Sequence, residues 1–221
     1  MLSNYKKHLS YIYPIRHIKL KGEFHEVLEI VWEDGRMVLN SNYANYSYGS
    51  LHQVFLNAFK QFKFCPNSKE DILILGFGAG SVFKILRQDY SFQGKIIGVE
   101  KDSKIISLAR EYFQIPENNP YFELLHQDAS LYVKSCKEKF NTIVVDIFVE
   151  LNVPDLFLKS DFMLELKKIL KKNGCIFFNI IQTTATPLNT VKKSIEISNL
   201  SYTYFEQKIY NTNNFILKII N

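Results

Sequence analysis

The sequence predicts an α/β fold with a mostly parallel sheet, a C-terminal antiparallel hairpin and a small N-terminal β-hairpin segment. Three observations lead to this prediction. From residue 71 onward, short apolar runs alternate with helical patterns, which is typical of parallel βαβ units. Two runs rich in β-branched and aromatic residues flank the turn-rich residues 211–214 near the C-terminus. Another pair of such runs, within residues 27–41, flanks Asp34-Gly35, a strong signal for a two-residue turn.

A short polar linker, residues 65–71 with Pro66, divides the chain in two. We predict an N-terminal hairpin-and-helix segment over residues 1–65 and a main domain over residues 66–221. A chain of 221 residues with 47% hydrophobic content can bury one sizeable core of this kind. In the N-terminal segment, residues 50–62 predict a helix, because their apolar residues share one face and Ser50 and Gln53 form a capping box.

The elements of the main domain follow from the same patterns. Strands are predicted over residues 72–75, 95–100, 121–127, 141–148 and 175–181. Helices are predicted over residues 81–88, 103–113, 130–136 and 160–174, and the last one ends at Gly174 with lysines in its last turns. A further helix follows with Thr186 as N-cap and Pro187 at its first position. Strands over residues 201–210 and 214–220 complete the C-terminal hairpin.

Composition and charge exclude several classes of function. The first thirty residues contain no apolar run like a signal sequence, and no later segment reaches the length of a membrane-spanning helix, so we expect a cytoplasmic protein without membrane contact. Cys65, Cys136 and Cys175 lie far apart, with no CxxC pair and no histidine at ligand spacing, so no metal site is expected. The net charge is +5, but the lysines are spread along the chain, which argues against a nucleic-acid partner.

The glycine-rich loop after the first strand of the main domain, GFGAGS at residues 76–81, points most directly to a ligand. Gly76, Gly78 and Gly80 let the backbone approach a ligand closely, because glycine has no Cβ. The dinucleotide fingerprint GxGxxG and the Walker pattern GxxxxGK are both absent, which argues against NAD and ATP. The pattern favours an adenosyl ligand without a pyrophosphate, although a tight strand–helix turn with no ligand looks similar.

Acidic residues follow at the ends of the next three strands. Glu100, 24 residues after Gly76, can accept hydrogen bonds from both ribose hydroxyls. Asp128 can accept a hydrogen bond from an adenine amino group, or it can simply cap the helix after it. Asp146 ends the fourth strand, at the sheet edge where ligands bind in open α/β folds. Its carboxylate can contact the molecule that receives a transferred group, or it can only accept hydrogen bonds from the loop that follows.

These motifs, in this order, resemble a known family. The segments ILILGFGAGS, IIGVEKDSKIISLAREYF, HQDASLYV and FNTIVVDIF are similar to the spermidine synthase-like branch of the S-adenosylmethionine-dependent methyltransferase superfamily, with a likeness over residues 27–181. The resemblance implies a Rossmann-like class I methyltransferase fold and suggests a homodimer. It also implies an adenosyl-sulfonium donor, S-adenosyl-L-methionine or its decarboxylated form, and a small-molecule acceptor. The residues that would hold the donor are Gly76, Gly78, Gly80, Glu100 and Asp128, and Asp146 would face the acceptor.

Three departures from the aminopropyltransferase pattern bear on the acceptor. Ala79 stands where those enzymes commonly carry the acid of GGGDG, whose carboxylate faces the donor's amine. Only Asp146 remains of their DSSDP motif, because this chain has DIFVE. Their Tyr-His-Glu run in the first helix appears as Leu51, His52 and Gln53. Two acidic partners for a cationic polyamine are therefore missing from the pattern.

We therefore expect an enzyme that transfers a methyl group from S-adenosyl-L-methionine to a small or peptide-like acceptor. Aminopropyl transfer to a polyamine is the alternative, and a binding protein that keeps the fold without the chemistry is a third hypothesis. Methylation of a nucleobase amino group is not expected, because DIFV lacks the proline-aromatic motif of those enzymes.

Both transfer reactions attack a carbon next to a sulfonium, which is already a good leaving group. A protonated amine acceptor needs a base, and Asp146 is the candidate, with His52 as its helper. His52 can equally be an ordinary surface residue in the first turn of its helix. Tyr46 and Tyr48, just before that helix, can wall the acceptor pocket or pack the hairpin onto the main domain.

Overall fold

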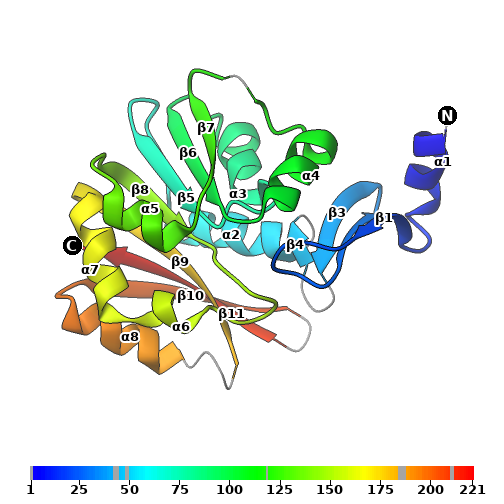
Figure 1. The fold of residues 1–221 in the computed structure, drawn as a ribbon. Coiled ribbons are helices and arrows are strands. Elements are labelled where there is room, and N and C mark those ends of the chain that lie inside the picture. The colour runs from blue at the N-terminus through cyan, green and yellow to red at the C-terminus, as the bar shows by residue number, and fades with distance from the viewer. Residues whose placement is uncertain (1, 42–44, 48–49, 118, 184–187, 210–211) are drawn as a thin grey trace.

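The main domain is built on a 7-stranded sheet with the order β10-β11-β9-β8-β5-β6-β7 (Figure 1). The protein is represented by a computed structural model that describes residues 2–41, 45–47, 50–117, 119–183, 188–209 and 212–221. The strands of this sheet are β5 (Asp71–Leu75), β6 (Lys95–Glu100), β7 (Phe122–His126), β8 (Phe140–Val145), β9 (Leu170–Gln182), β10 (Ser201–Ile209) and β11 (Thr212–Ile220).

Strand pairing confirms the predicted architecture. β5 pairs in parallel with β6 and β8, β6 pairs in parallel with β7, and β8 with β9. β11 is antiparallel to both β9 and β10, which gives the C-terminal hairpin. Because the chain runs from β5 to β7 on one side and returns to β8 on the other, the sheet has a switch point beside β5. Ligands of open α/β sheets bind at the carboxyl ends of the strands at such a point.

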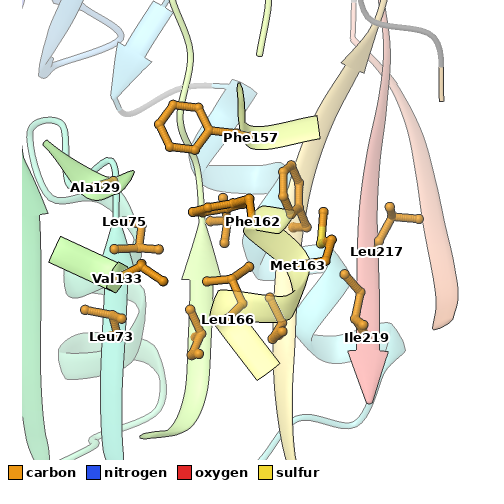
Figure 2. Close-up of a cluster of buried hydrophobic side chains, with 14 of the residues drawn as sticks. Leu73, Leu75, Ala129, Val133, Phe157, Phe162, Met163, Leu166, Leu217 and Ile219 are labelled. Carbon is orange, nitrogen blue, oxygen red and sulfur yellow. The ribbon is translucent and has the colours of Figure 1, made fainter. Parts of the chain in front are cut away.

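Helices cover both faces of the sheet (Figure 1). On one face lie α2 (Ser50–Gln61), α3 (Ser81–Lys84) with its π-helical continuation η1 (Ile85–Asp89), and α4 (Ser103–Phe113); on the other lie α5 (Ala129–Ser135), α6 (Asp155–Leu158), α7 (Ser160–Ile169) and α8 (Leu188–Ile197). Alternate strand residues supply the two cores, since side chains alternate between the faces of a strand. Leu73 and Leu75 face α5 and α7 (Figure 2), whereas Ile72 and Ile74 belong to the opposite core.

Helix α2 packs directly on the main sheet. Phe55 and Phe59 are fully buried, and the ring of Phe59 lies 4.9 Å from that of Phe177 on β9, in a T-shaped arrangement. The predicted boundary between residues 65 and 66 would leave α2 in the N-terminal segment. That division of the chain stays a prediction.

The N-terminal residues form a second, smaller sheet that lies beside the main domain, with α1 (Leu2–Leu9) at its outer end (Figure 1). Its order is β1-β2-β3-β4, with the strands β1 (Ile15–Leu20), β2 (Leu28–Glu33), β3 (Arg36–Ser41) and β4 (Asn45–Ser47). The predicted hairpin is the pair β2–β3. Its central residues Asp34 and Gly35 have φ of 48° and 72°, and two positive φ values are the requirement of a type I′ turn.

One predicted boundary is wrong. The helix expected to end at Gly174 ends at Ile169, and the following residues begin β9. Leu170 already pairs with Phe140 of β8, and Lys171 forms an ion pair with Asp71, with 2.7 Å between Nζ and Oδ2. A tertiary partner therefore draws this lysine into the strand, although its sequence position suits a helix C-terminus.

Two predicted features cannot be compared with the structure, because Thr186 and Pro187 lie outside the described residues. Within the described parts of the chain, no helix combines the length and the apolar character needed to cross a membrane.

Candidate active site

A cavity lies at the carboxyl ends of β5, β6, β7 and β8. Residues that line it include Gly76, Gly78, Glu100, Asp128 and Asp146, all predicted from the sequence as site residues. They come from four different strand ends, so the fold alone brings them together. The site is therefore at the sheet edge that the topology favours for a ligand.

Gly76 is needed for packing as well as for conformation, and Gly80 is needed for its conformation. Gly76 has φ of +79°, and a Cβ there would lie 2.3 Å from the backbone oxygen of Asp146. Gly80 has φ of +87°, and a Cβ there would lie 2.5 Å from Cδ1 of Ile115. Gly80 is not among the described residues that line the cavity, so the structure explains this glycine by its positive φ.

The Glu100 carboxylate holds the glycine loop in place. Its Oε2 accepts a hydrogen bond of 2.9 Å from the backbone N–H of Gly78. Its Oε1 accepts from the backbone N–H groups of Lys101 (2.8 Å) and Asp102 (3.1 Å). Burial raises the pKa of Glu100 above its ordinary value, and these three hydrogen bonds oppose that shift. A carboxylate offers about four lone-pair sites, so Glu100 can accept a further bond from a ligand.

Asp128 caps α5. Its Oδ1 accepts hydrogen bonds from the backbone N–H of Ser130 (2.8 Å) and from its hydroxyl (2.6 Å). Burial alone would raise the pKa of Asp128, but the hydrogen bonds from Ser130 and the backbone lower it below its ordinary value. The helix cap considered from the sequence is thus present. It does not exclude a ligand contact, because Asp128 also lines the cavity.

Asp146 is a carboxyl group whose pKa lies near neutral pH. Burial raises the pKa of Asp146 to about 7, an effect opposed by a hydrogen bond from Asn179 and reinforced by the negative charge of Glu100. The Nδ2 atom of Asn179 lies 2.9 Å from Oδ1 of Asp146. The backbone N–H of Asp146 donates to the oxygen of Leu75 at 2.9 Å, which fixes its main chain to β5. This group can take up or release a proton near neutral pH.

The structure does not bring every predicted residue to this cavity. His52 lies on α2 and is not among the described residues that line it; burial lowers its pKa, and the charges that act on it come from Asp89 and Arg36. A helper role for His52 beside Asp146 therefore has no support from this geometry. Tyr46 lies in β4, and Tyr48 is outside the described residues.

The loop before β2 contributes residues that the sequence analysis missed. Phe24 and His25 line the cavity, and Nζ of Lys101 lies 3.9 Å from the centroid of the Phe24 ring. Asp102, which is 1% exposed, holds this loop by accepting hydrogen bonds from the backbone N–H groups of Glu23 (3.1 Å) and Phe24 (3.4 Å). These contacts join residues 78 and 79 positions apart in the chain. No local sequence pattern reports contacts at such a separation.

Glu150 is a second missed residue of the cavity. It lies in the loop after β8, four residues beyond Asp146, and lines the same cavity. The Ser41 hydroxyl donates to its Oε2 at 2.6 Å, and Nδ1 of His25 lies 3.8 Å from its Oε1. The DIFVE segment lacks the acid that the DSSDP motif has at its fourth position. Glu150, the fifth residue of DIFVE, places a carboxylate in the cavity instead. An acidic residue in this loop was the available signal.

The cavity is rich in carboxylates. Its described lining contains the carboxylates of Glu100, Asp102, Asp128, Asp146 and Glu150, and one lysine, Lys101. Such a set favours a ligand that carries positive charge, such as a sulfonium or an ammonium. Among the residues that the structure describes, no group of three or more histidine, cysteine, aspartate or glutamate side chains could hold a metal ion.

Comparisons with known proteins agree with this architecture. Residues 58–213 match the model of the spermine/spermidine synthase domain. A polyamine aminopropyltransferase of Chromobacterium violaceum is 31% identical over 108 residues, which are 49% of this chain and 41% of that relative. This chain thus spans less than half the length of that relative.

Solved structures show the same fold. A probable spermidine synthase from Corynebacterium glutamicum superposes with a TM-score of 0.75 at 20% identity, over 91% of this chain and 78% of that one. Human methyltransferase-like protein 13, in complex with SAH, superposes with a TM-score of 0.63 at 16% identity, over 78% of this chain and 82% of that one. The family match covers most of the chain, including the glycine loop and the strand ends that line the cavity. The chain belongs to the spermine/spermidine synthase domain family.

Proposed function

We propose that this chain transfers an alkyl group from an S-adenosyl-sulfonium donor to an amine, with aminopropyl transfer to a polyamine as the reaction. The observation that carries the proposal is that Glu100 and Asp146 line one cavity, and that the pKa of Asp146 is about 7. The first carboxylate can bind the donor, and the second can take a proton from the acceptor.

The donor half of the proposal uses the glycine loop and two strand ends. Glu100 accepts a hydrogen bond from a ribose hydroxyl, and Asp128 accepts one from the adenine amino group. Gly76 and Gly78 let the main chain approach the adenosyl group, since both have positive φ and line the cavity. These assignments match the positions at which the sequence resembles the family.

The acceptor half uses Asp146. An aliphatic amine is protonated at neutral pH and has no free electron pair for attack, so a base must remove a proton first. A carboxylate with a pKa of about 7 accepts that proton far more readily than one with the ordinary value of 3.8. The nitrogen then forms a bond to the donor carbon, and the carbon–sulfur bond breaks with its electron pair passing to sulfur, which leaves as a neutral thioether.

Two lines of evidence favour aminopropyl transfer. The relative from Chromobacterium violaceum is named a polyamine aminopropyltransferase, and the Corynebacterium structure is described as a probable spermidine synthase. Glu150 supplies a further carboxylate in the cavity, which suits an acceptor with a second ammonium group.

Methyl transfer from intact S-adenosyl-L-methionine is the second candidate, and one observation favours it. Ala79 stands where aminopropyltransferases commonly carry the acid of GGGDG, and it is fully buried and is not among the described residues that line the cavity. The donor's ammonium then lacks a charged partner from this loop position.

The products of the reaction decide between the two candidates. We expect that putrescine, incubated with the protein and decarboxylated S-adenosylmethionine, gains one aminopropyl group by mass spectrometry. In a parallel sample, intact S-adenosyl-L-methionine should give no methylated product. Gain of a methyl group there would make methyl transfer the function. Donor binding without any modified amine, across a panel of amines, would contradict transfer altogether and would fit a binding protein.

A further inference from the structure

Asn179 is a fully buried polar residue in the middle of an apolar strand. It lies on β9 between Phe178 and Ile180, and all three are 0% exposed. Burying an amide group is costly unless its polar atoms find hydrogen-bond partners. Apolar residues fill the neighbouring positions, so packing alone does not account for an asparagine here.

The partner of Asn179 is the proposed base. β8 and β9 run in parallel with Val145 opposite Phe178, so Asp146 and Asn179 are the next residues along the two strands. Nδ2 of Asn179 donates to Oδ1 of Asp146 at 2.9 Å. Among the described residues, Oδ1 of Asn179 has no hydrogen-bond partner. In the described part of the structure, the Asn179 side chain therefore makes its hydrogen bond to Asp146.

We infer that Asn179 is a positioning residue for the proposed transfer: its amide group occupies Oδ1 of Asp146 and leaves Oδ2 to receive the proton of the acceptor amine. The inference rests on the proposed function. When the proton arrives on Oδ2, Oδ1 becomes the carbonyl oxygen of a neutral acid and still accepts from Nδ2. Asn179 can thus hold Asp146 in one orientation in both protonation states.

The same hydrogen bond favours the charged form of Asp146 and lowers its pKa, against the effect of burial. The other titratable groups that act on Asp146 or share its cavity are Glu100 from β6, Lys101 and Asp102 after it, Asp128 before α5, Glu150 from the loop after β8, and His25 from the loop before β2. Asn179 differs from all of these, because it touches Asp146 directly and does not titrate itself.

The test compares Asn179→Leu, which removes the donor at similar volume, with Thr142→Val. Thr142 is 2% exposed and lies on β8 four residues before Asp146, so its variant removes a buried hydroxyl from the same strand. In Asn179→Leu, the acidic limb of kcat/KM against pH should move up by about one to two pH units. At pH values below the midpoint, kcat/KM of Asn179→Leu should therefore be about tenfold to a hundredfold lower than that of the parent. At higher pH the two values should converge. Thr142→Val should leave the midpoint in place.

A second readout needs no activity. The difference in unfolding free energy between the parent and Asp146→Asn, measured against pH, reports where Asp146 titrates in the folded protein. The midpoint should rise when the same comparison is made in the Asn179→Leu background. Asn179→Ala, which removes the donor and adds no titratable group, serves if Asn179→Leu does not fold.

The outcomes separate the two claims. An unchanged midpoint in either variant, or a uniform loss of activity at every pH, would overturn the positioning role. A parent protein without transfer activity would overturn the proposed function instead, and the stability measurement would still decide whether Asn179 controls Asp146.

Discussion

Replacing Asp146 with asparagine should lower turnover by about a hundredfold to ten-thousandfold, the range typical for loss of a general base. The asparagine keeps the shape of the side chain and can still bond to Asn179, but it cannot accept a proton from the amine. Donor affinity should stay close to that of the parent, because Glu100 and the glycine loop are unchanged. Steady-state kinetics and calorimetric titration with the donor measure the two quantities separately.

The stability of this variant should depend on pH with a defined sign. The folded pKa of Asp146 is about 7, above its ordinary value of 3.8, so folding favours the neutral form. The stability linked to this neutral form is fully present below pH 3.8 and is lost as pH rises through 7. Asp146→Asn removes that loss, so its unfolding free energy relative to the parent should be higher at pH 8 than at pH 5.

The matched control is Asp161→Asn, an exposed position on α7. It should change neither turnover nor the pH dependence of stability. If Asp146→Asn turns over like the parent, or loses stability equally at both pH values without a kinetic defect, Asp146 is a structural residue.

Replacing Glu100 with alanine should weaken donor binding by about 1.5 to 3 kcal/mol, the range expected for one charge-assisted hydrogen bond. The change corresponds to about a tenfold to 150-fold higher Kd. Glu100 also orders the site, because its carboxylate accepts from Gly78, Lys101 and Asp102. Part of the loss should therefore come from a loosened glycine loop, and calorimetry of the donor complex measures the total.

Glu123→Ala controls for the removal of an acidic side chain, since Glu123 is exposed on the neighbouring strand β7. It should bind the donor like the parent. Circular dichroism and a melting curve establish that Glu100→Ala is folded. Parent-like affinity in a folded Glu100→Ala protein would rule out its assignment to the ribose.

The main sheet could be predicted from the sequence because its signals are local. Apolar runs such as residues 72–75 and 143–145 lie in buried strands, and strand and helix patterns alternate without interruption. Glu100, Asp128 and Asp146 follow from the same logic. Carboxyl ends of neighbouring parallel strands meet at one edge, so residues at those ends share a cavity without any further information.

The features that escaped prediction depend on contacts between distant parts of the chain. Glu150 reaches the cavity from a loop that Ser41 of β3 holds, and Asn179 matters only because β9 lies beside β8 in one register. The early end of α7 has the same origin, because Lys171 finds Asp71, 100 residues away in sequence. Helix propensity and charge pattern carry no information about such partners.

The expectation for His52 stays a prediction. Its position matches a family pattern in the first helix, but His52 is not among the described residues that line the cavity, and the charges that act on its pKa come from Asp89 and Arg36. A sequence motif fixes the position of a residue on a helix. The packing of that helix decides which side chains reach the site.

The central claim is that the cavity at the ends of β5, β6 and β7 binds an adenosyl-sulfur compound. Its most direct test is one calorimetric titration with methylthioadenosine, the thioether that aminopropyl transfer would release, run on the parent and on Glu100→Ala. The account predicts binding to one site in the parent and a Kd at least tenfold higher in the variant. Absence of binding in the parent, or equal affinity in the two proteins, would contradict it.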